Sequence, residues 1–181
     1  MESSLNVQPV DGRVGTVCTL DHPPNLNGLV SLFDELQRRA VAQFRFRLVG
    51  QPSSFGATLA ARYPFVEYLG PLSDNALRAE AATWCCFTHP MFVYAKGCST
   101  KLGTALGWGL PIATTVFGAR GYTWDEQLLP LSTSAPELAQ AVFERSKIDH
   151  FERHQKATLD IVRLMPTVNT VGNHIRDFLT P

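Results

Sequence analysis

The segment YAKGCSTKLGTALGWGLPIATT, residues 94–115, combines residue types that can bind an anion. Gly97 is followed by the hydroxyls of Ser99 and Thr100 and by Lys101, where helical apolar spacing begins. Free backbone N–H groups and the positive end of the helix dipole make such a helix start an anion site. The segment therefore predicts phosphate binding, although it matches neither of the two common phosphate-loop patterns. The alternative is a turn glycine, a capping serine and a solvated lysine.

Histidines offer two further candidate sites. His89 follows an apolar stretch that reads as a buried strand, so it can contact a phosphate or a sugar; the alternative is a packing residue. His150 and His154 have the spacing of two ligands on one helix face. No third ligand accompanies them, and we expect a solvated helix face and no metal.

Composition restricts the class of protein. The 181 residues are 45% hydrophobic and their formal net charge is zero, which disfavours binding to nucleic acid or to an anionic membrane. Four cysteines without C-x-x-C spacing indicate a reducing compartment. No apolar run reaches about 18 residues and no signal-peptide core is present. We expect a cytoplasmic domain.

Apolar periodicity predicts strands that alternate with helices. The expected strands are 14–20, 44–50, 65–70, 84–88 and 111–116, and the expected helices are 26–40, 53–61, 74–82, 100–108, 135–145, 150–165 and 167–179. This order predicts a Rossmann-like three-layer α/β/α domain over residues 13–181, with a mainly parallel sheet of about six strands, after a loose leader at 1–12. Ligands of such sheets bind beyond the carboxyl ends of the strands, here at loops 21–27, 88–99 and 117–124.

An ordered series of motifs resembles the donor-binding domain of GT-B glycosyltransferases of the retaining "group 1" class. DHPPN, RLVG and YLGPLSD precede a signature segment in the order and spacing of that family. The signature agrees at Gly97, Lys101, Ala105, Leu106, Gly109, Pro111, Thr114, Gly118 and Gly121. The resemblance covers residues 13–179.

The resemblance implies a function and a set of roles. Residues 97–101 would hold the diphosphate of a nucleotide sugar, and the backbone around Gly70, Pro71 and Leu72 would edge the base. The loop from His89 to Lys96 would face the sugar. The chain would transfer a sugar from this donor, with no other cofactor, and an N-terminal domain in the same or a partner chain would bind the acceptor.

The chain departs from the family pattern at its charged positions. Lys96 and Thr104 stand where the family carries two glutamates, one near the sugar and one on the ribose. Thr19 and Asn25 lie near the positions of the family's basic residues, for which Lys96 and Arg120 are the candidate substitutes. These differences favour an alternative, a non-catalytic GT-B-like module for binding or scaffolding. A nucleotide-sugar epimerase of similar architecture is a third possibility.

Overall fold

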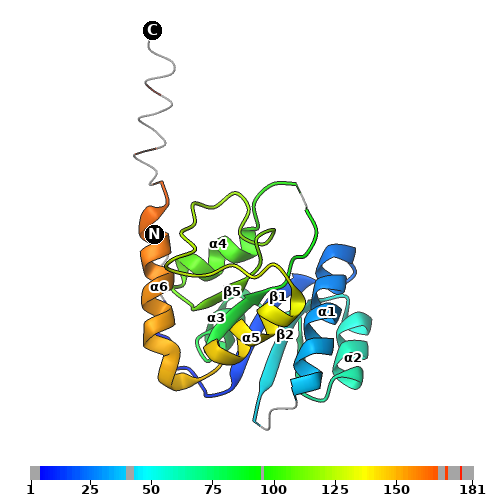
Figure 1. Cartoon of the computed structure of the whole chain (residues 1–181). Coiled ribbons are helices and arrows are strands. Elements are labelled where there is room, and N and C mark those ends of the chain that lie inside the picture. The colour runs from blue at the N-terminus through cyan, green and yellow to red at the C-terminus, as the bar shows by residue number, and fades with distance from the viewer. Residues whose placement is uncertain (1–4, 40–42, 95, 167–169, 171–175, 177–181) are drawn as a thin grey trace.

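The computed structural model describes residues 5–39, 43–94, 96–166, 170 and 176 (Figure 1). Its strands form one parallel sheet in the order β3-β2-β1-β4-β5. The strands are β1 (Arg13–Thr19), β2 (Arg45–Gln51), β3 (Val66–Gly70), β4 (Cys86–His89) and β5 (Ile112–Thr114). The expected Rossmann-like α/β architecture is confirmed.

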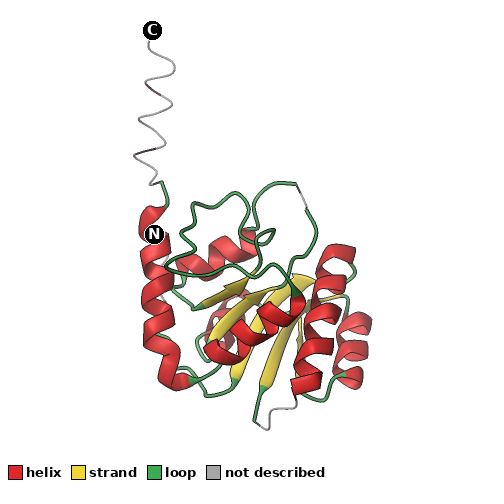
Figure 2. Ribbon diagram, viewed as in Figure 1, coloured by secondary structure: helices red, strands yellow, loops and turns green. Residues whose placement is uncertain are grey.

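Helices cover both faces of the sheet (Figure 2). They are α1 (Pro23–Arg39), α2 (Ser53–Arg62), α3 (Asp74–Ala81), α4 (Thr100–Gly107), α5 (Ala135–Arg145) and α6 (Phe151–Leu164), with a short 3-10 turn, η1 (Ile148–His150). One apolar cluster joins α1, α2 and α5 to the sheet, and a second joins α3, α4 and α6 to its other face. This three-layer arrangement leaves the carboxyl ends of the strands and their loops uncovered by helices.

The sheet has five strands in the described part of the chain, rather than about six. Beyond β5 the described residues add only an isolated bridge between Thr115 and Ser132. The strand expected at 84–88 begins at Cys86, because the Trp84 N–H donates to the Ala81 carbonyl in the turn after α3. The shorter strand ends at His89, which places this histidine at the carboxyl edge of the sheet.

Helix α1 begins earlier than the sequence predicts. The His22 carbonyl already accepts the Leu26 N–H at 3.0 Å, so Pro23 and Pro24 occupy the first turn. Proline suits that position because the N–H it lacks would have no helical partner. Asn25, the residue before the helix expected at 26–40, lies within α1 and donates its side-chain amide to the Thr19 carbonyl at 2.9 Å. This bond ties the start of α1 to the end of β1.

The two ends of the chain are described only in part. In the expected loose leader, the N–H groups of Gln8 and Val10 donate to the carbonyls of Ala82 and Thr83, so this portion lies on the domain. The helix expected at 167–179 falls almost wholly outside the described residues. Among the helices that are described, none is long and apolar enough to cross a bilayer.

Candidate anion-binding site

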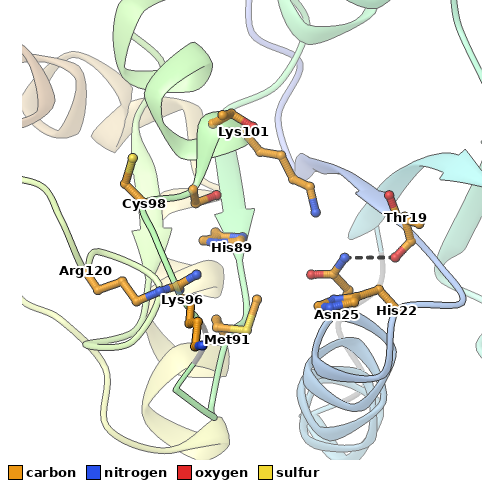
Figure 3. Close-up of a pocket in the computed structure, with 11 residues that line it drawn as sticks. Thr19, His22, Asn25, His89, Met91, Lys96, Cys98, Lys101 and Arg120 are labelled. Carbon is orange, nitrogen blue, oxygen red and sulfur yellow. Dashed lines mark hydrogen bonds between the residues drawn. The ribbon is translucent and has the colours of Figure 1, made fainter.

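A cavity of about 410 Å³ opens at the carboxyl ends of β1 and β4 (Figure 3). The chain runs from β1 to β2 and β3 on one side and returns to β4 and β5 on the other, so the cavity lies where the strand order reverses. Ligands of open α/β sheets bind at this switch point. The cavity is lined by Thr19, His22, Asn25, His89, Met91, Lys96, Cys98, Ser99, Thr100, Lys101 and Arg120.

The first turn of α4 forms one wall of the cavity. Ser99 caps this helix, as its sequence position predicts, because its Oγ accepts the Leu102 N–H at 3.3 Å. Gly97 has a φ of +73°, a left-handed conformation that favours glycine, and open space lies where a side chain would project. Residue 97 therefore has no side chain that could block access from the cavity to the backbone N–H groups of the first turn.

His89 lies in the middle of the site with 4% of its surface exposed. Its carbonyl accepts the Thr114 hydroxyl at 2.9 Å, while its Nε2 has no partner in the described part of the chain. Burial, together with the charges of Lys101 and Arg120, lowers the pKa of His89 to about 3. The imidazole is therefore neutral at pH 7, with one ring N–H able to donate a hydrogen bond.

Cationic side chains dominate the charge of the cavity. Lys101, Lys96 and Arg120 line it, and the described lining residues include no Asp or Glu. Burial lowers the pKa of Lys101, an effect that the Cys18 thiol partly opposes. Arg120 donates from Nη1 to the Phe117 carbonyl at 2.7 Å, while its buried Nε has no described partner. A cavity with this lining attracts anions.

Several residues predicted from the sequence meet here. His89, Lys96, Ser99, Thr100, Lys101 and Arg120 all line the cavity. Thr104 instead lines a smaller cavity of about 150 Å³ that shares Thr100 and Lys101 with the first. Its hydroxyl donates to the Thr100 carbonyl at 3.0 Å, within the same helix.

The remaining predicted residues lie elsewhere. Gly97 belongs to the turn before α4 but is not part of the lining, and Gly70, Pro71 and Leu72 line neither cavity. The contact of Gly70, Pro71 and Leu72 with the nucleotide base therefore stays a prediction. The structure adds His22, Met91 and Cys98 to the lining. All three lie in loops that follow β1 or β4, the loops in which ligands of this architecture are expected.

The described residues contain no group of three or more His, Cys, Asp or Glu side chains placed to hold a metal ion. His150 ends η1 and His154 lies in the first turn of α6, with ring centroids 6.2 Å apart. Burial and nearby cationic groups lower the pKa of His154 to about 4.

Comparison with known proteins gives likeness in structure only. No protein-family model matches the sequence, and no curated protein matches it. TarM superposes with a TM-score of 0.70 at 12% identity, over 97% of this chain and 36% of TarM. HepE from Anabaena, in complex with UDP and glucose, gives 0.68 at 19% identity, over 94% of this chain and 48% of HepE.

A further solved structure has nearly the extent of this chain. The C-terminal domain of LpcC from Francisella tularensis, a glycosyl transferase group 1 family protein, gives a TM-score of 0.62 at 11% identity and covers 86% of both chains. The chain thus spans about a third to a half of TarM and HepE and corresponds in extent to one domain. The fold that the sequence resemblance predicts is confirmed: the chain has the α/β fold of the C-terminal domain of LpcC and of part of TarM and HepE.

Proposed function

We propose that this chain is the donor-binding half of a glycosyltransferase and that the cavity between β1 and β4 holds the diphosphate of a nucleotide sugar. The observation that carries the proposal is the charge of the lining, which includes Lys96, Lys101 and Arg120 and, among the described residues, no carboxylate. The cavity lies at the first turn of α4, whose N–H groups and dipole add to this preference for anions.

The same groups suit the chemistry of sugar transfer. Negative charge grows on the diphosphate as its bond to the sugar breaks, and preorganised cations and N–H donors stabilise that charge. Lys101 and the start of α4 supply them. His89, neutral and buried, donates a hydrogen bond to the phosphate or the sugar, and Lys96 faces the sugar.

Transfer needs a second half for the acceptor. HepE was solved with UDP and glucose, and this chain spans 48% of HepE. We infer that an N-terminal domain, in the same or a partner chain, completes the cleft. The four cysteines are all unpaired, which fits a reducing compartment such as the cytoplasm.

Calorimetric titration with UDP, GDP and ADP, with and without magnesium, tests the proposal. Micromolar binding of one of them is expected. Lys101→Ala removes a half-buried cation from the site and should weaken binding at least about tenfold, since hydrogen bonds to charged groups contribute about 1.5–3 kcal/mol. Lys156→Ala is the matched control, because Lys156 is an exposed lysine of α6. A folded protein that binds none of the three nucleotides contradicts the proposal.

A second candidate function is a binding module that does not transfer sugar. It is favoured by Thr104, which stands where the family places its ribose glutamate and whose hydroxyl is used within α4. Thr104→Glu restores a carboxylate that can accept both ribose hydroxyls and should tighten nucleotide binding if the ribose lies there. No gain in the folded variant places the ribose elsewhere.

A further inference from the structure

The cations of the cavity lie on opposite sides of His89. Figure 3 shows the Lys101 ammonium on the side of Thr19 and Asn25, whereas Arg120 and Lys96 lie across His89 from it. Lys101 and Arg120 both act electrostatically on the imidazole, which agrees with a position between them. The cavity therefore has two cationic ends rather than one.

One diphosphate accounts for only one of these ends. Lys101 stands in the first turn of α4, so an anion bound to the N–H groups of that turn also meets its ammonium. Each of the two phosphates of a nucleotide sugar carries one negative charge, and Lys101 together with the helix dipole, which is equivalent to about half a unit charge, offsets most of that charge. Lys96 and Arg120 then remain as cations for which the diphosphate supplies little counter-charge.

Among the residues that the structure describes, neither of these two cations has a carboxylate partner. No Asp or Glu of the described residues forms an ion pair with Lys96 or Arg120, and the buried Arg120 Nε–H finds no acceptor among those residues. His89 adds a buried, unpartnered Nε2 to the same cavity. A cationic end of the cavity with no carboxylate among its described lining residues favours a ligand that brings negative charge to it.

We propose that the donor sugar is acidic, an inference that rests on the proposed function. The sugar is a uronic acid whose carboxylate binds Lys96 and Arg120, while the diphosphate binds Lys101 and the first turn of α4. A guanidinium matches the geometry of a carboxylate, and an ammonium beside it adds charge without fixing geometry. Lys96 then acts as a specificity residue, selecting the acidic sugar over the neutral hexose.

The test compares two donors that differ only at the sugar C6. For the base that binds, the hexose and its uronic acid are titrated by calorimetry: UDP-glucose with UDP-glucuronic acid, GDP-mannose with GDP-mannuronic acid, or ADP-glucose with ADP-glucuronic acid. We expect the uronic form to bind about tenfold more tightly, as one charge-assisted hydrogen bond provides.

Variants at residue 96 assign the preference. Lys96 is exposed, so Lys96→Ala should fold. It should weaken binding of the uronic form more than binding of the hexose form and so abolish the preference between them. Lys96→Glu should reverse the preference. Lys156→Ala should leave both affinities unchanged.

The outcomes separate this inference from the function on which it rests. Equal affinity for the two sugars overturns it, and an equal loss of both in Lys96→Ala would assign Lys96 to the diphosphate. An anionic acceptor as the partner of Lys96 and Arg120 would likewise leave the two donors equal. Failure to bind UDP, GDP and ADP would overturn the donor site itself.

Discussion

The Tyr122 hydroxyl donates a hydrogen bond to the Ser99 carbonyl at 2.6 Å. The Ser99 side-chain Oγ caps α4 by accepting the Leu102 N–H, while the Ser99 carbonyl oxygen accepts the Tyr122 hydroxyl. The bond from Tyr122 joins the loop after β5 to the first turn of α4, which forms one wall of the candidate anion-binding cavity. The position of the α4 N–H groups therefore depends on a residue that does not line the cavity.

Tyr122→Phe tests this dependence. The variant keeps the ring and loses the bond, which should lower the free energy of unfolding by about 0.5–1.5 kcal/mol. Nucleoside diphosphate affinity should fall as well, because the first turn of α4 is held less firmly. Thermal melting and calorimetric titration measure the two effects. Unchanged affinity in a less stable variant would show that the bonds of Ser99 within α4 position it without the tyrosine.

Gly103 in the same helix makes room for this hydroxyl. A Cβ at residue 103 would lie 2.5 Å from the Tyr122 oxygen, too close for both to keep their places. Gly103→Ala should therefore destabilise the wild-type domain by about 1–3 kcal/mol, as overpacking does. In the Tyr122→Phe background the same change should stabilise by up to about 1 kcal/mol, the usual helix preference for alanine. Denaturant unfolding of the wild-type domain, the two single variants and the double variant measures the sign of the stability change in each background. Destabilisation of equal size in both backgrounds would exclude the hydroxyl as the cause.

Local signals in the sequence predicted much of this arrangement. Ser73, Ser99 and Ser134 cap helices where their positions predict, because a cap depends on only a few consecutive residues. The alternation of strands and helices predicted a parallel sheet, and the rule for strand ends placed His89 and Lys101 in one site.

Side-chain bonds to loop carbonyls could not be predicted in the same way. The Asn25 side chain bonds to the Thr19 carbonyl at the end of β1, and the bond of Tyr122 to Ser99 spans 23 residues. Neither has a spacing that periodicity can reveal. The contribution of Cys98 to the cavity also depends on how loops of different strands meet, which is a property of tertiary packing.

The buried His89 gives the domain a pH dependence in acid. An unfolded histidine has a pKa near 6.5, and that of His89 in the fold is about 3, so the unfolded state binds the additional proton between these values. The contribution to stability is complete above about pH 6.5 and is lost as the pH falls toward 3, by up to about 1.4 kcal/mol per pH unit.

His89→Gln should therefore flatten the dependence of unfolding free energy on pH between about 6 and 4, measured by urea denaturation. His154, whose pKa is lowered to about 4, keeps its own contribution in that variant. His22→Gln is the control, because it removes an exposed imidazole from the same cavity. An unaltered slope in His89→Gln would mean that His89 is protonated in the folded domain.

Cys98 should be the thiol that reacts first. Only the thiolate is nucleophilic, and burial raises the pKa of Cys18 and Cys85 to about 11 and that of Cys86 to about 12. Cys98 is exposed and lines the anion cavity. A negatively charged aromatic disulfide should therefore label one thiol in the native domain and all four in denaturant, and Cys98→Ser should abolish the native reaction. A bound nucleoside diphosphate should slow the labelling, since both occupy the same cavity. Rapid labelling of Cys18 in the native domain would contradict the expected order of reactivity. A labelling rate that saturating nucleotide leaves unchanged would show that Cys98 lies outside the nucleotide's binding site.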